Sequence, residues 1–295
     1  MKSAFTRFCS RLGSVALLAL TLLAAAAPVG ARPLRCATDG QTQDASDVRL
    51  ARLPAPAGGA GHYALILNGD AGKHHVQNCI DAYAALRANG FTDDDIFLLS
   101  NEPRVGSANV PTLGHNDGPP STRNLAAVFR YLREQVGPAD TLVVYVTGHG
   151  GYDGGKDPHC FIEIAPREKN KKVCSSGQLA LDSFVAGVSA IHPRRGLFVF
   201  DQCFGHAFAS TLADNGSFVS IALSTKPEEV FCQNFSPFFW SELRKSGQLR
   251  KPLPRRSVKA AYERAAKIAR KKEKTQRPEM KLGPGVDPAK FFLWE

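Results

Sequence analysis

The stretches Leu142–His149, LVVYVTGH, and Leu197–Cys203, LFVFDQC, decide the fold of this chain. Each is a continuous apolar run that ends at polar residues, which is typical of a buried strand in a parallel sheet. Open parallel sheets place their chemistry beyond the carboxyl ends of their strands. We therefore expect His149 and Cys203 to lie side by side at one edge of a sheet.

The rest of the chain alternates between strand-like and helix-like segments from His62 onward. Strands are predicted at residues 63–69, 95–100, 161–165 and 217–225, and helices at residues 76–89, 122–136 and 179–191. Ser175 or Ser176 is expected to cap the last of these helices, another helix is expected to begin near His206, and the FFLW segment near the C-terminus is a candidate edge strand. This alternation predicts an α/β fold, with a mainly parallel sheet and helices on both faces.

The N-terminal segment has the composition of a secretory signal. Lys2, Arg7 and Arg11 precede an apolar stretch, and small residues follow it up to Ala31. The apolar stretch is shorter than the about 20 residues that a bilayer span needs, so an exported protein, periplasmic or secreted, is favoured over an N-terminally anchored one. We expect a signal peptide over residues 1–31, a flexible leader over 32–61 and one folded domain over 62–295.

The chain is basic, with a formal net charge of +10, and many of its cations lie between Arg250 and Lys281. Val258, Ala261 and Ala265 recur at helical spacing in this run, so most of the cations are expected on the solvated face of a packed helix. Contact of this face with an anionic envelope surface is the alternative, because such clusters attract polyanions without a dedicated site. Nucleic acid is not an expected partner of an exported protein.

A thiol and an imidazole at neighbouring strand ends suit nucleophilic catalysis. A thiol attacks a carbonyl as the thiolate, and a neighbouring imidazole promotes ionisation of the thiol and then protonates the leaving amine. Cys203 and His149 fit these roles. Gly150 has no side chain to shield its backbone N–H, so this N–H and that of Cys203 are candidate donors to the oxyanion.

The other cysteines and histidines carry weaker signals. Cys160 and Cys174 flank a polar excursion and are the pair most suited to a disulfide bond in an exported protein. The histidines and cysteines lack the spacings that mark zinc sites, so no metal ion is expected. No phosphate-binding glycine loop is present either, and no cofactor is expected.

With these residues in view, the chain resembles the legumain-like (asparaginyl endopeptidase) family of caspase-fold cysteine peptidases. Three blocks carry the resemblance: LNGDAGKHHVQNCIDAYAALRANGFTDDDI from Leu67 to Ile96, the strand TLVVYVTGHG, and FDQC, where the family has Glu-Ala-Cys. The resemblance implies a caspase-like three-layer α/β/α sandwich in which His149 and Cys203 form the catalytic dyad. It also implies that His74, His75 and Asp201 line the primary specificity pocket.

The pocket residues depart from the family pattern. His74 stands where the family has an arginine that binds an asparagine side chain. Glu228 and Glu229 fall near the segment that forms another wall of the pocket in the family. Together with Asp201, these carboxylates favour a Lys or Arg residue before the scissile bond, while simple solvation of the two glutamates is the alternative.

The residues and the resemblance predict an exported cysteine endopeptidase that acts on a peptide or protein substrate through a thioester. A transpeptidase or transamidase would use the same dyad and differ only in the nucleophile that resolves the thioester. A catalytically silent protein that binds the envelope through its basic helix is the third hypothesis.

Overall fold

The computed structural model describes residues 60–101, 110–153, 159–164, 177–216, 218–223, 234–248, 256–274 and 277–293. All of them belong to the unit Asp39–Glu295. In chain order, the elements of the described part are β1 (His62–Asn68), α1 (Lys73–Ala88), β2 (Ile96–Ser100), α2 (Thr122–Gln135), β3 (Thr141–Thr147), β4 (Gly150–Tyr152), β5 (Cys160–Glu163), β6 (Gln178–Ala180), α3 (Leu181–Ser189), β7 (Arg195–Asp201), α4 (Gly205–Asn215), β8 (Phe218–Ala222), α5 (Ser236–Gln248), α6 (Val258–Lys272) and β9 (Glu279–Leu282).

The main sheet has six strands in the order β2-β1-β3-β7-β8-β9. All neighbouring pairs are parallel except β8 with β9, which is antiparallel. The mainly parallel sheet predicted from the alternation of strands and helices is therefore confirmed. The central strands end in register, since Asn68 pairs with Thr147 and Thr147 pairs with Asp201, so the segments that follow β1, β3 and β7 leave the sheet at one edge.

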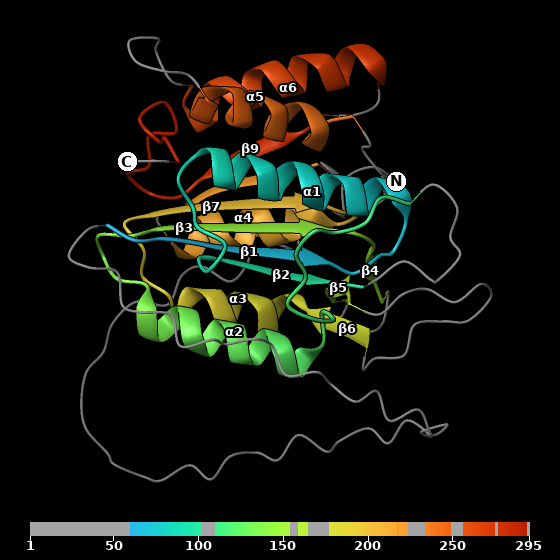
Figure 1. Cartoon of the computed structure of the whole chain (residues 1–295), viewed down its shortest axis with the longest axis vertical. Helices are drawn as coiled ribbons and strands as arrows, with labels where there is room; N and C mark the ends of the chain where they lie inside the picture. Colours follow the sequence, from blue (N-terminus) through green and yellow to red (C-terminus); the bar gives the residue numbers. More distant parts are fainter. Residues whose placement is uncertain are drawn as a thin grey trace, which may run out of the picture. The chain divides into compact units, whose positions relative to one another are not determined.

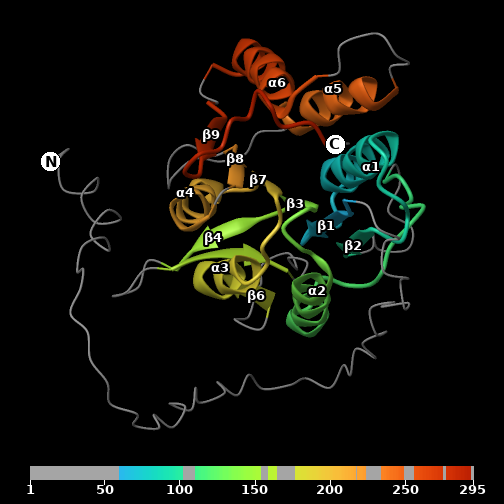
Figure 2. The same ribbon diagram turned by 90° about the vertical axis from the view of Figure 1, so that its left-hand side faces the viewer.

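Helices cover both faces of this sheet (Figures 1 and 2). One apolar cluster joins α1, α5 and α6 to one face, and a second joins α2, α3 and α4 to the other. Successive residues of β1 alternate between the two clusters: Ile66 belongs to the first, and Leu65 and Leu67 to the second. Burial on both faces explains why the strands read as continuous apolar runs, and the arrangement is compatible with a three-layer sandwich.

A small antiparallel sheet interrupts the expected alternation. Its strand order is β4-β5-β6, so Gly150 and residues 161–163 do not extend the main sheet as the sequence pattern suggested. Strand β3 ends at Thr147, and Gly148 follows with φ at +134°, a backbone conformation that favours glycine and turns the chain. The helix expected over 179–191 begins only at Leu181, and its N-cap is Ala180, without a side-chain cap, rather than a serine.

The C-terminal segment also differs from the expectation. The edge strand beside β8 is β9, and the described part of the FFLW segment forms no strand. Phe291 and Leu293 are instead buried in the cluster beneath α6, and the Phe291 carbonyl accepts a hydrogen bond from the Val258 N–H at the start of that helix. The segment therefore serves as core packing and as a backbone partner for a helix terminus.

Helix α6 confirms the predicted amphipathic helix. Val258, Ala261, Ala265 and Ala269 are buried, and the last turn carries Arg270, Lys271 and Lys272. The Ser257 hydroxyl caps its N-terminus by accepting from the Ala260 N–H. Within the described residues, no helix has the length and apolar character needed to span a membrane.

Candidate active site

Strands β3 and β7 bring the two predicted catalytic segments together. They are adjacent and parallel, and Thr147 pairs with Asp201, so His149 and Cys203 each lie two residues beyond the same level of the sheet. Gly150 packs directly on the backbone of Cys203, because a Cβ at Gly150 would overlap the Cys203 carbonyl oxygen. The start of β4, which follows β3 closely, and the turn after β7 are thus in contact at the carboxyl edge of the sheet.

Cys203 lies in a strained turn between β7 and α4. The next residue, Phe204, has φ of 59° and ψ of 11° and is the one non-glycine residue with positive φ in the described part of the chain. For a bulky residue this conformation costs on the order of 1–3 kcal/mol, and such strain concentrates at functional sites. The Phe204 ring stacks on Tyr152 with centroids 5.9 Å apart, which helps to hold the turn.

The same turn places Cys203 directly before Phe204, the N-cap residue of α4, and the Cys203 side chain is half-buried. The N-terminus of a helix carries a partial positive charge, which favours the thiolate of a nearby cysteine. The position therefore suits a reactive thiol that a substrate can reach.

Asp70 orients His149. Its Oδ2 atom lies 2.8 Å from His149 Nε2, and its Oδ1 atom accepts from the Gly72 N–H at 2.6 Å. The hydrogen bond from His149 is the largest cause that lowers the pKa of Asp70 to about 2, so Asp70 is a carboxylate near neutral pH. Nε2 therefore carries the proton that it donates to Asp70, which leaves His149 Nδ1 as the nitrogen able to exchange a proton with a reacting group.

Asp70 was not among the residues predicted from the sequence. It stands two residues after the end of β1, and its own N–H donates to Asn68 Oδ1 at 2.9 Å. The sequence feature that could have indicated Asp70 is its place in a polar run directly after an apolar strand. The pairing of β1 with β3, which brings Asp70 beside His149, cannot be read from the sequence alone.

His74 and His75 lie beside His149. The rings of His75 and His149 are 6.0 Å apart, those of His74 and His75 are 3.8 Å apart, and His75 Nδ1 lies 2.7 Å from the Thr147 hydroxyl. Burial lowers the pKa of His75 to about 3, so its imidazole is neutral. The two histidines that the resemblance assigned to the specificity pocket therefore lie next to the imidazole of His149, with His74 half-buried and His75 buried.

Asp201, the last residue of β7, lies in the protein interior. It is 3% exposed, and its Oδ2 atom accepts from Asn78 Nδ2 at 2.9 Å and from the Tyr145 hydroxyl at 3.1 Å. Glu228, Glu229 and Cys174 lie outside the described residues, so the basic specificity pocket and the Cys160–Cys174 disulfide bond stay predictions.

Burial of Asp201 predicts a pH-dependent stability. Desolvation raises the pKa of this carboxyl to about 6 from its usual 3.8, so the folded state binds the proton more tightly than the unfolded state does. The resulting stabilisation is fully present below about pH 4 and is lost as the pH rises through about 6, a loss of roughly 3 kcal/mol. We expect Asp201→Asn, which keeps a carbonyl acceptor for Tyr145 and Asn78, to remove this part of the pH dependence.

The measurement is the free energy of unfolding in urea across this pH range for the wild type and the variant. Asp214→Asn, at an exposed position on α4, is the matched control and should retain the wild-type slope. A slope that is the same in Asp201→Asn and in the wild type would contradict the assignment.

The backbone N–H of Gly150 is left unused by the small sheet. The Glu163 N–H donates to the His149 carbonyl, and Gly150 pairs with Ile162. In an antiparallel ladder, hydrogen-bonded and non-hydrogen-bonded pairs alternate, so Gly150 and Ile162 form a non-hydrogen-bonded pair and the Gly150 N–H points away from β5. The Gly150 N–H is therefore not used by β5, and its oxyanion role stays a prediction.

Gln202 is a second residue that the sequence analysis did not single out. It is 4% exposed, and within the described part of the chain neither its Oε1 nor its Nε2 atom has a hydrogen-bond partner. Nε2 would lie 3.1 Å from a Cβ at Gly150, so the amide sits under the contact between Gly150 and Cys203. Buried amides normally have hydrogen-bond partners. The Gln202 amide is therefore a polar group of the site that is available to form a hydrogen bond.

In the described part of the chain, no three His, Cys, Asp or Glu side chains are gathered so that they could hold a metal ion. No protein-family model matches the sequence, and no curated protein is similar to it. The inference about function therefore depends on the residues of the site.

Proposed function

We propose that this chain is an exported cysteine endopeptidase with a caspase-like fold. Cys203 is the nucleophile, His149 is the general base and acid, and Asp70 is a positioning residue that holds the His149 ring. The single observation that carries the proposal is the meeting of three strand ends: Asp70 after β1, bonded to His149 after β3, beside the strained turn that holds Cys203 after β7.

In the proposed reaction, the Cys203 sulfur forms a bond to the carbonyl carbon of the scissile peptide while His149 Nδ1 holds the thiol proton. The carbonyl oxygen becomes an oxyanion that the N–H groups of Gly150 and Cys203 stabilise. The C–N bond then breaks, and His149 gives its proton to the leaving amine, which leaves an acyl thioester on Cys203. Water attacks this thioester, His149 takes one water proton and returns it to the sulfur, and a carboxylic acid departs.

The resemblance to legumain-like peptidases supports the caspase-like fold, and the helices on both faces of a mostly parallel sheet are compatible with it. The signal-like residues 1–31 support export. A preference for Lys or Arg before the scissile bond is part of the proposal and depends on Glu228 and Glu229, because the buried Asp201 carboxyl does not reach a substrate.

The experiment is cleavage of a proteome-derived peptide library by the purified protein, with identification of the new termini by mass spectrometry. We expect new carboxyl termini that cluster at basic residues and that are missing with Cys203→Ala. Products extended by an added amine would instead indicate the transpeptidase that uses the same dyad. A library left uncut under reducing conditions would contradict the proposed endopeptidase.

Asp70→Asn is expected to lower kcat by about 10²-fold with little change in KM. The amide cannot stabilise the imidazolium that forms during catalysis, and it permits the wrong ring tautomer. Asp94→Asn, at an exposed position before β2, is the control. A loss of activity that follows the loss of thermal stability, with KM changed as much as kcat, would indicate a merely structural Asp70.

A further inference from the structure

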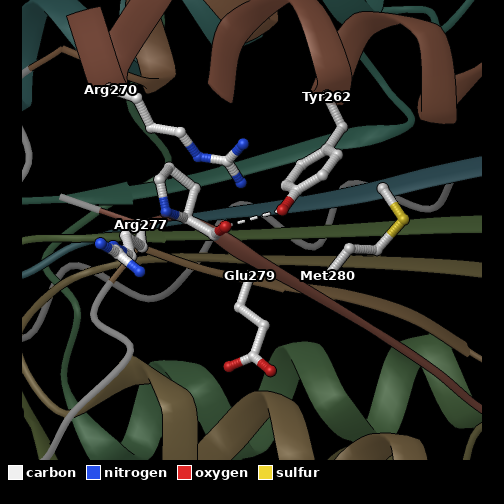
Figure 3. Close-up of a pocket in the computed structure, with 6 residues that line it drawn as sticks. Tyr262, Arg270, Arg277, Glu279 and Met280 are labelled. Atoms are coloured by element: carbon white, nitrogen blue, oxygen red, sulfur yellow. Dashed lines mark hydrogen bonds between the residues drawn. The ribbon is translucent and has the colours of Figure 1, made fainter. Parts of the chain in front are cut away.

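A second site lies between helix α6 and the edge strand β9. A cavity of about 480 Å³ is lined by Tyr262 and Arg270 of the helix and by Arg277, Pro278, Glu279 and Met280 of the strand and the residues leading into it. The Tyr262 hydroxyl donates to the Pro278 carbonyl at 2.7 Å and ties the two walls together (Figure 3). The cavity is therefore fixed by contacts between the two elements.

Two guanidinium groups give this cavity its charge. Arg270 and Arg277 are exposed, and neither forms an ion pair with any residue in the described ranges. Arg270 reaches from the helix toward the strand, and Arg277 belongs to the segment before β9, with its guanidinium apart from that of Arg270 (Figure 3). An arginine fork matches the planar geometry of a carboxylate, so the two side chains present a binding surface for an anionic group.

The acidic residue of the cavity does not cancel this charge. Glu279 Oε2 lies 3.0 Å from His206 Nδ1, and its Oε1 lies 2.6 Å from Lys281 Nζ. Figure 3 shows the Glu279 carboxylate turned away from the two arginines. Glu279 therefore pairs with His206 and Lys281 rather than with the two arginines. The guanidinium groups stay available to a ligand.

The register of the sheet places this cavity at the active-site edge. Glu279 pairs with Ala222, and Ala222 pairs with Phe200, so the start of β9 lies level with the end of β7, two strands away. Two strand spacings are about 10 Å. The contact from Glu279 to His206, which stands three residues after Cys203, links the cavity wall to the first turn of α4.

We propose that Arg270 and Arg277 bind the carboxylate of an acidic residue in the peptide substrate. The start of β9 and the end of β7 lie at the same edge of the sheet, so one extended peptide can contact the arginines and Cys203 together. The assignment rests on the proposed peptidase function and adds the substrate class: peptides that carry Asp or Glu at one fixed distance from the cleaved bond.

The first test measures binding without catalysis. The Cys203→Ala protein is titrated into a fluorescein-labelled peptide of Ala, Gly and Ser that carries one Glu, and into the same peptide with Gln, at about 0.15 M salt, where long-range attraction is screened. We expect the Glu peptide to bind about tenfold more tightly. Adding Arg270→Ala and Arg277→Ala should abolish this ratio.

The matched control removes the same charge from the exposed face of the same helix, with Lys267→Ala and Lys271→Ala. This variant should keep the tenfold ratio. A ratio below twofold in the parent protein, or an equal loss in both double variants, would overturn the carboxylate site, the second result indicating general attraction to a basic surface.

The second test is the cleavage profile of the active protein. We expect Asp and Glu to be enriched at one fixed position relative to the cut bond, and Arg270→Ala with Arg277→Ala to remove this enrichment while cleavage continues. Cleavage without an acidic preference would overturn the site and leave the peptidase intact. Selective binding of the Glu peptide by a protein that cleaves nothing would contradict the peptidase and leave the site standing.

Discussion

Cys203→Ala and His149→Ala are each expected to lower the rate of peptide hydrolysis by about 10³-fold or more. Cys203 supplies the sulfur that forms the thioester, and no neighbouring hydroxyl or amine can replace it in the same turn. His149 both assists ionisation of the thiol and protonates the leaving amine, so its loss affects both halves of the reaction. Because the two residues act as a unit, the double variant should lose little more than either single variant.

The measurement is hydrolysis of the best peptide from the cleavage profile, with thermal unfolding of each variant as a check on folding. Cys79→Ala and His115→Ala are the controls, since Cys79 is buried in the core and His115 bonds to Asp117 in a loop before α2. Both controls should retain activity near the wild-type level. A Cys203→Ala protein that keeps a tenth of the wild-type rate would contradict the nucleophile assignment.

Gly150→Ala is expected to lower kcat by about 10²- to 10³-fold. The added methyl group would overlap the Cys203 carbonyl oxygen and crowd Gln202 Nε2, so the backbone at the start of β4 must move away from the turn that holds the nucleophile. A displacement of about 1 Å is enough to take the Gly150 N–H out of reach of the oxyanion and to misalign the sulfur. The crowding should also cost about 1–3 kcal/mol of stability.

Gly114→Ala is the matched control, because a Cβ at Gly114 would meet no atom within 4 Å. Steady-state kinetics with the same peptide, together with urea unfolding, separate the catalytic loss from the loss of stability. If Gly150→Ala is destabilised but keeps kcat within about threefold of the wild type, the oxyanion role is wrong.

The strands of the main sheet were predictable because they are buried on both faces. Runs such as Leu142–Val146 and Leu197–Phe200 have no polar interruption, and a parallel sheet covered by helices buries such runs completely. The order of the strands, by contrast, depends on which neighbours pair, and no local pattern records this. Asp70 could therefore be seen as a polar residue after a strand but not as the partner of His149.

Two elements were not predicted correctly because local sequence patterns do not record tertiary contacts. Helix α5 was not predicted, although it buries Phe239 and Trp240 against α1 and α6. The FFLW segment has the composition of a strand, but Phe291 and Leu293 pack as isolated apolar anchors in the core beneath α6. A short apolar run fits a strand, a helix or an anchored loop, and only tertiary contacts decide between them.

The most direct test of the paired imidazole and thiol is the rate at which iodoacetamide modifies Cys203 near neutral pH, followed by mass spectrometry of tryptic peptides. We expect Cys203 to be alkylated far faster than Cys79, because burial raises the pKa of the Cys79 thiol well above its usual range. His149→Ala should slow the reaction of Cys203 by about tenfold or more, since the thiolate loses its imidazole partner. Equal labelling of the cysteines, or a Cys203 rate that His149→Ala leaves unchanged, would contradict the account.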